Sequence, residues 1–86
     1  MPKYRLYYHD ACPYCIRVLS ELKKMGTEVE LRDVLRNSAY RHKLVQRGGR
    51  YQVPCLQIID NDTENEWLYE SAAIIARLHE VPASIN

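Results

Sequence analysis

The chain has 86 residues, of which 47% are hydrophobic and 27% are charged, a composition typical of a folded domain rather than a disordered segment. A chain of this length builds one small core, so we expect residues 1–86 to form a single domain. The net charge of +1 gives no electrostatic reason to expect binding to nucleic acid or to a membrane surface.

The N-terminal sequence and the cysteine count both indicate a cytoplasmic protein. MPKYRLYYHD lacks the apolar stretch of a signal peptide, and no segment approaches the roughly 18 apolar residues of a spanning helix. Three cysteines fit poorly with the paired disulfides of a small secreted protein. Chemistry or metal binding is therefore a stronger hypothesis for Cys12 and Cys15 than a structural disulfide.

The first third of the chain predicts a strand, a helix and a second strand. A tyrosine-rich run over 3–9 favours a buried strand. After Pro13 the spacing of the apolar residues becomes helical, and Gly26 is suited to end that helix. These apolar residues are Ile16, Val18, Leu19, Leu22 and Met25. Val29 and Leu31 alternate with charged residues, which indicates a half-buried strand.

The middle of the chain predicts a second helix followed by a β-hairpin. We expect this helix to begin near residues 37–38 and to end at residues 48–49. Tyr40, Leu44 and Val45 are expected to face inward. The apolar run at 53–59 and the run EWLY at 66–69 flank the polar turn DNDTEN, as two hairpin strands would.

The last predicted element is a helix capped by Ser71, with Ile74, Ile75 and Leu78 on its buried face. The order of elements is then βαβαββα. A strand, helix and strand followed by a hairpin and a helix imply an α/β fold with a mixed sheet and helices packed against it.

The motif CPYC at residues 12–15 lies at the junction of the first strand and the first helix. Unpaired amides and the positive end of the helix dipole stabilise a thiolate on Cys12 there. Cys15 lies one turn later, close enough to bond to Cys12. Pro13 suits the first helical turn, and we expect Tyr14 to line the groove at the thiols. The pattern therefore predicts redox chemistry, with Cys12 attacking and Cys15 resolving.

Two other interpretations of the cysteine pair remain open, a metal site and an inert pair. A structural zinc site needs four ligands, usually from a second C-x-x-C or a close histidine pair. The remaining candidates, Cys55, His9, His42 and His79, are scattered along the sequence, so we expect no metal. We interpret Cys55 as a core residue, with a third redox partner as the alternative.

CPYC after a short strand, with VP at 53–54 before a later strand, resembles the glutaredoxin family of the thioredoxin fold. YESAAI at 69–74 is similar to the glutathione-binding half of glutathione transferases. The resemblance implies a four-stranded mixed sheet flanked by three helices. It also implies a monomeric glutathione-dependent oxidoreductase that reduces protein disulfides and glutathionylated proteins.

The resemblance further implies a glutathione site beside Cys12. The proline at position 54 is expected to be cis, which is uncommon in folded proteins, and to leave the backbone of Val53 free to pair with the tripeptide. Arg50 or Gln52 would meet the glycine carboxylate of glutathione.

Glu70 and Ser71 match the pair that holds the γ-glutamyl end of glutathione in this resemblance. The carboxylate would bind the ammonium group, and the hydroxyl with the helix N-terminal amides would bind the carboxylate. Glutaredoxins commonly carry a lysine three residues before the first cysteine, where this chain has His9. Since histidine is only partly charged at neutral pH, His9 would support the thiolate and glutathione less strongly.

Two other functions are alternatives to a thiol oxidoreductase. In the first, two protomers hold a glutathione-ligated iron-sulfur cluster through their Cys12 thiolates, a hypothesis that Pro13 and Cys15 weaken. In the second, the domain binds glutathione without catalysis, and the presence of both cysteines argues against it.

Overall fold

The computed structural model describes residues 3–60 and 66–80. Along the chain the elements are β1 (Lys3–Tyr8), α1 (Pro13–Met25), β2 (Glu30–Asp33), α2 (Ser38–Lys43), η1 (Leu44–Gly48), β3 (Cys55–Ile59), β4 (Glu66–Leu68) and α3 (Ser71–His79). The segment η1 is a π-helical turn that continues α2 without a break. The expected βαβαββα order is confirmed.

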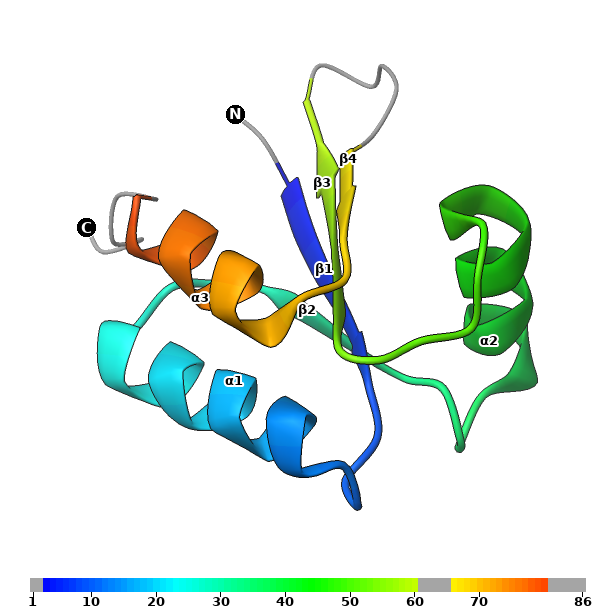
Figure 1. The fold of residues 1–86 in the computed structure, drawn as a ribbon, viewed down its shortest axis with the longest axis horizontal. Helices are drawn as coiled ribbons and strands as arrows, with labels where there is room; N and C mark the ends of the chain where they lie inside the picture. The colour runs from blue at the N-terminus through cyan, green and yellow to red at the C-terminus, as the bar shows by residue number, and fades with distance from the viewer. Residues whose placement is uncertain (1–2, 61–65, 81–86) are drawn as a thin grey trace.

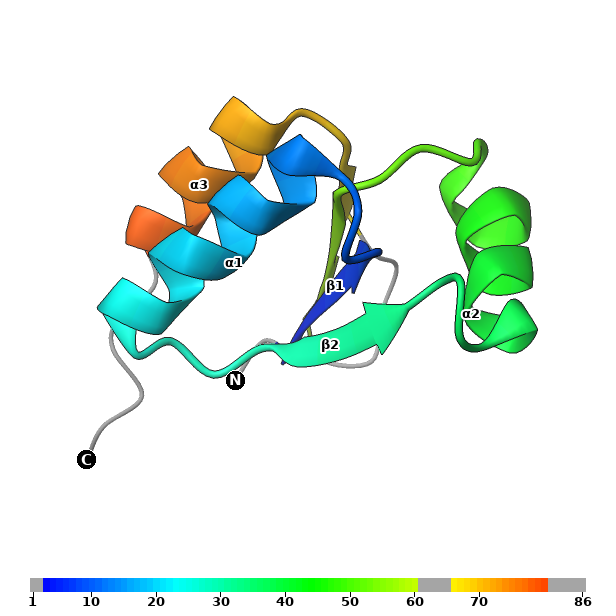
Figure 2. The ribbon, with the colours of Figure 1, turned by 90° about the horizontal axis from the view of Figure 1, so that it is seen from below.

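The four strands form one mixed sheet in the order β2-β1-β3-β4. β1 pairs in parallel with β2 and antiparallel with β3, and β3 pairs antiparallel with β4. Helices α1 and α3 lie side by side on one face of the sheet, and α2 lies on the other (Figures 1 and 2). The predicted hairpin is present, while most of its turn, residues 61–65, lies outside the described residues.

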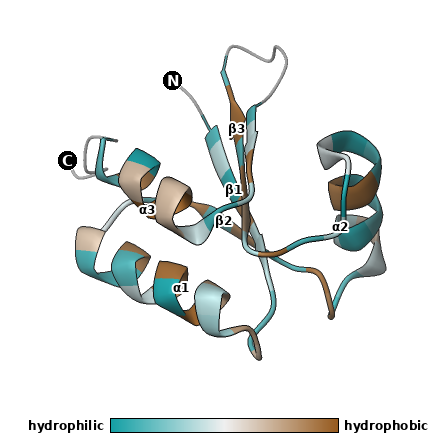
Figure 3. Cartoon of the chain, in the orientation of Figure 1, coloured by the Kyte–Doolittle hydropathy of each residue, from teal (hydrophilic) through white to brown (hydrophobic). Residues whose placement is uncertain are grey.

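Two hydrophobic clusters occupy the two faces of the sheet, because successive residues of a strand point to opposite sides. Leu6 faces α1 and α3, and its neighbour Tyr7 faces α2; both are fully buried. The first cluster comprises Leu6, Val18, Leu22, Leu56, Ile58, Ile74 and Leu78. The second comprises Tyr7, Val34, Leu44 and Cys55. Figure 3 shows hydrophobic and hydrophilic residues interspersed along α1, as expected of a helix with one buried side, whereas β3 is largely hydrophobic.

Three apolar residues that we expected to face inward are exposed. Ile16 is 52% exposed, Leu31 48% and Val45 41%. Neighbouring residues of a helix lie about 100° apart around its axis, and the buried positions are taken by the residues just before Ile16 and Val45. Leu31 lies on the edge strand β2, where it borders an open groove beside α1.

The ends of the helices follow the predicted caps with one correction. The Asn37 side chain accepts a hydrogen bond from the backbone amide of Ala39 at 2.9 Å, which caps α2. Helix α3 begins one residue earlier than expected, because the carbonyl of Glu70 already accepts the amide of Ile74 at 2.9 Å. Glu70 is therefore the N-terminal cap residue, and Ser71 is the first residue of the helix.

Candidate active site

Cys12 is the N-terminal cap residue of α1, with Pro13 as the first helical residue. Its sulfur accepts a hydrogen bond from the backbone amide of Cys15 at 3.4 Å. The side chain is partly buried. A free helix amide directed at the sulfur stabilises negative charge on it, as does the positive end of the helix dipole.

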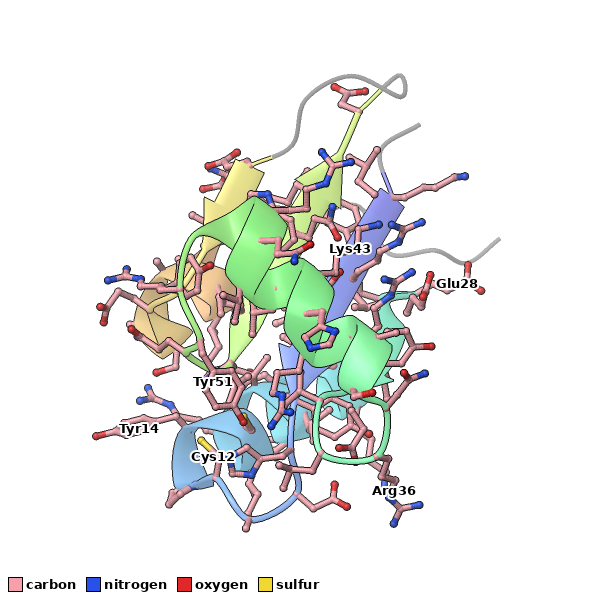
Figure 4. The ribbon with its side chains drawn as sticks, turned by 90° about the vertical axis from the view of Figure 1, so that its right-hand side faces the viewer. Cys12, Tyr14, Glu28, Arg36, Lys43 and Tyr51 are labelled. Atoms are coloured by element: carbon pink, nitrogen blue, oxygen red, sulfur yellow. The ribbon has the colours of Figure 1, made fainter. Side chains whose placement is uncertain are left out.

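The loop between η1 and β3 passes next to Cys12. The Val53–Pro54 peptide bond is cis, as expected, and the Cys12 thiol donates a long hydrogen bond to the carbonyl of Val53, at 3.9 Å. Figure 4 shows Cys12, Tyr14 and Tyr51 at the same end of the molecule. The contact with Val53 brings together segments that lie 41 residues apart in the sequence.

Cys15 differs from Cys12 in its surroundings. It is a fully buried residue of α1. Burial, together with the hydrogen bond and charge of Cys12, raises the pKa of the Cys15 thiol from 9.0 to about 12. Cys15 therefore stays protonated at neutral pH, while Cys12 is the thiol that a substrate can reach.

A pocket of about 290 Å³ is formed by three segments of the chain, the start of α1, the cis-proline loop and the start of α3. Its lining residues are Tyr14, Gln52, Val53, Pro54, Tyr69, Glu70 and Ser71. All of them except Tyr69 were sequence-predicted site residues. The fold thus gathers predicted residues from distant parts of the sequence around one concave surface.

Five predicted site residues do not line this pocket: His9, Cys12, Pro13, Cys15 and Arg50. The exposed side chain of Arg50 lies over the ring of Tyr69, with the guanidinium carbon 4.4 Å from the ring centre. The carbonyl of His9 accepts the amide of Cys12 at 3.4 Å. The ring atom Nδ1 of His9 is buried and has no hydrogen-bond partner within residues 3–60 and 66–80.

Tyr69 is the lining residue that the sequence analysis missed. We grouped it with the hairpin run EWLY, whereas the structure ends β4 at Leu68 and places Tyr69 in the corner before α3. Its position immediately before Glu70 and Ser71 could have identified it from the sequence as a site residue. A residue next to a proposed ligand-binding pair was a candidate for the same pocket.

Cys55 is fully buried next to the cis-proline. Burial raises the pKa of its thiol to about 12, opposed by a hydrogen bond with the Tyr69 hydroxyl. These surroundings agree with the prediction that Cys55 is a core residue. No three His, Cys, Asp or Glu side chains gather as metal ligands in the part of the chain that the structure describes.

The model of the glutaredoxin family matches residues 5–63, which is more than half of the chain. The chain belongs to the glutaredoxin family. No curated protein sequence matches this chain significantly.

Solved structures place this glutaredoxin-family chain in the thioredoxin-like fold. The thioredoxin-like protein BC3987 is 26% identical with a TM-score of 0.67, and the match covers 91% of this chain and 97% of that one. Glutaredoxin from Brucella melitensis is 23% identical with a TM-score of 0.57, and the match covers 91% and 79% of the two chains. The expected α/β thioredoxin-like fold is confirmed.

The fold is also shared with a glutathione-binding enzyme. Maleylacetoacetate isomerase from Anaeromyxobacter dehalogenans is 25% identical with a TM-score of 0.68, over 92% of this chain and 37% of the isomerase. That structure contains glutathione bound in its active site. The present chain thus spans about a third of the isomerase.

Proposed function

We propose that the protein is a glutathione-dependent thiol-disulfide oxidoreductase that acts through Cys12 and Cys15. The observation that carries this proposal is the position of the Cys12 sulfur. It accepts an amide at the N-terminus of α1 and lies against the carbonyl of Val53, at the loop that lines the pocket. Membership of the glutaredoxin family supports the same chemistry.

With a glutathionylated protein as substrate, the Cys12 thiolate attacks the glutathione sulfur of the mixed disulfide. A new bond forms between Cys12 and glutathione, and the protein thiolate leaves and takes up a proton. A second glutathione, as thiolate, then attacks the glutathione sulfur. This step releases oxidised glutathione and restores the Cys12 thiolate, so one free glutathione is consumed and the adduct supplies the other half of the oxidised glutathione.

With a protein disulfide as substrate, the Cys12 thiolate attacks one protein sulfur and forms a mixed disulfide with it, while the other protein sulfur leaves as a thiolate and takes up a proton. Cys15 then attacks the Cys12 sulfur and loses its proton, and the released protein thiolate takes up a proton. The resulting bond between Cys12 and Cys15 is reduced by two glutathione molecules. Because Cys15 is buried and protonated, it acts only as the second thiol.

We further propose that glutathione occupies the pocket with its γ-glutamyl end at the start of α3. The carboxylate of Glu70 would hold the ammonium group, and the hydroxyl of Ser71 and the free amides of the helix would hold the carboxylate. The backbone of Val53, beside cis-Pro54, would pair with the peptide part, and Gln52 or Arg50 would meet the glycine carboxylate. Tyr14 would form the opposite wall.

The proposed partners are glutathione and proteins that carry disulfides or glutathione adducts, and we propose a cytoplasmic monomer. None of the helices in the described ranges is long and apolar enough to cross a membrane.

The test is a glutathione-coupled assay on the wild type and on single-cysteine variants. Cys12→Ser is expected to abolish all activity, because no other thiol is activated by a helix N-terminus. Cys15→Ser is expected to keep the removal of glutathione from mixed disulfides and to lose the reduction of protein disulfides. Gln46→Ala, an exposed substitution outside the pocket, is the control.

An inactive wild type, or a Cys15→Ser variant as inactive as Cys12→Ser, would refute this mechanism. The visible absorption of the purified protein separates it from the cluster-carrier alternative, since a thiol oxidoreductase without a cluster is colourless.

A further inference from the structure

Tyr69 lines the pocket, and its hydroxyl makes three contacts. It donates to the backbone carbonyl of Arg50 at 3.3 Å and is hydrogen-bonded to the thiol of Cys55. It also lies directly against Gly48 at the end of η1, where a Cβ atom would collide with it. These contacts fix the long axis of the ring, and the packing of Tyr69 against the second hydrophobic cluster restricts rotation about that axis.

The ring of Tyr69 supports the guanidinium group of Arg50. The guanidinium carbon lies 4.4 Å from the ring centre, within the range of a cation–π interaction. No carboxylate in the described part of the chain forms an ion pair with Arg50. Its positive charge is therefore held in place beside the pocket and remains available for an anion.

The backbone of Tyr69 fixes a second predicted ligand. Its carbonyl accepts a hydrogen bond from the side-chain amide of Gln52 at 3.5 Å. Tyr69 thus contacts both candidate ligands of the glycine carboxylate and directly precedes Glu70. It connects the cis-proline loop to the start of α3, the two walls of the pocket that come from the second half of the chain.

We infer that Tyr69 is a positioning residue of the proposed glutathione site, which holds the Arg50 guanidinium at the rim of the pocket for a carboxylate of glutathione. The inference rests on the proposed function. An arginine on a free loop would lose the mobility of its long side chain on binding, whereas an arginine already stacked on a ring loses less. Tyr69 therefore strengthens glutathione binding through Arg50.

The test measures kcat and KM for glutathione in a double-mutant cycle of Tyr69→Leu and Arg50→Ala. The loss of an exposed cation–π contact predicts a KM about two- to fivefold higher in Tyr69→Leu, with kcat nearly unchanged. In the Arg50→Ala background the same change should have almost no further effect on KM, because Tyr69 acts through Arg50. Tyr69→Phe keeps the ring under Arg50 but loses the hydroxyl contacts, so its KM should lie between those of the wild type and Tyr69→Leu.

Tyr40→Leu is the matched control. Tyr40 packs against the same hydrophobic cluster and lies under another arginine, Arg32, with the guanidinium carbon 4.8 Å from the ring centre, but it does not line the pocket. Its KM for glutathione should equal that of the wild type.

Three results would overturn the inference while leaving the proposed function intact: an unchanged KM in Tyr69→Leu, an unchanged KM in Arg50→Ala, or a Tyr69→Leu effect that persists fully in the Arg50→Ala background. The last result would mean that Tyr69 acts on glutathione directly. A wild type without glutathione-dependent turnover would refute the proposed function itself.

Discussion

At the scale of single residues, the two cysteines of one short motif have different environments. Cys12 is partly exposed at the helix N-terminus, and Cys15 is fully buried one turn later. The difference arises because Cys12 is the cap residue at the end of the helix, whereas Cys15 belongs to the buried side of the helix together with Val18 and Leu22. In the proposed mechanism, attack and resolution therefore fall to different sulfurs.

Glu70 and Ser71 give a prediction at the same scale. Glu70→Gln or Ser71→Ala should raise the KM for glutathione about tenfold, the effect of one lost hydrogen bond to a charged group. The rate of Cys12 alkylation by iodoacetamide should not change, because both residues are proposed to contact the end of glutathione that lies far from the sulfur. Steady-state kinetics and labelling followed by mass spectrometry measure the two effects.

Glu80→Gln, at the opposite end of α3, is the control for this experiment. If KM stayed at the wild-type value in both test variants, the γ-glutamyl end could not bind at the start of α3.

At the scale of elements, η1 packs closely against β4 and the corner that follows it. A Cβ atom at Gly48 would meet the Tyr69 hydroxyl and lie 3.0 Å from a ring carbon of Trp67. The Trp67 ring in turn packs against Tyr7, with ring centres 5.5 Å apart. The absence of a side chain at Gly48 thus lets the end of η1 approach the sheet.

Gly48→Ala should therefore lower the free energy of unfolding by about 1–3 kcal/mol, the usual cost of overpacking. The displaced Tyr69 ring should also weaken glutathione binding. Urea denaturation followed by tryptophan fluorescence measures the first effect, since Trp67 is the one tryptophan of the chain.

Gln46→Ala, an exposed substitution in the same turn, should leave the stability nearly unchanged. Equal unfolding midpoints for Gly48→Ala and the wild type would show that η1 does not approach the sheet as described.

At the scale of the whole molecule, the acidic groups buried around the sheet link stability to pH. Burial raises the pKa of Cys15 and Cys55 from 9.0 to about 12, and that of Tyr69 from 10.0 to about 12. Burial also raises the pKa of Tyr7, against the opposing effect of Arg32. Each group binds its proton more tightly in the folded state than in the unfolded state.

The sign of the pH dependence follows from this difference. Stability is fully present below the unfolded pKa values and falls as the pH rises above them, because the unfolded chain then releases protons that the folded chain retains. The free energy of unfolding should be flat from about pH 7 to pH 8 and should decline above about pH 9. Urea denaturation across this range measures it.

Cys55→Ala removes one of these groups. The free energy of unfolding of this variant should therefore decline less steeply with rising pH than that of the wild type, whatever its value at pH 7. A free energy of unfolding that stayed constant up to about pH 11 would contradict the burial of these groups.

The sequence by itself determined the order of the elements and the place of the reactive motif. Local spacing carries this information, because apolar residues recur every two residues in a strand and every 3.6 residues in a helix. CPYC lies at the point where the predicted strand ends and the predicted helix begins. The same spacing cannot decide which of two adjacent apolar residues is buried. We expected Ile16 and Val45 to face inward, and both are exposed.

The tertiary structure alone decided how the pocket is assembled and what Tyr69 does in it. Tyr69 contacts Gly48, Arg50 and Gln52, which lie 17 or more positions earlier in the sequence. A local pattern of apolar residues cannot predict contacts over such a sequence separation. These contacts exist because the sheet pairs β3 with β4 and so brings the cis-proline loop beside the start of α3. The sequence thus names most of the residues of the site, while the packing of distant segments sets their distances and orientations.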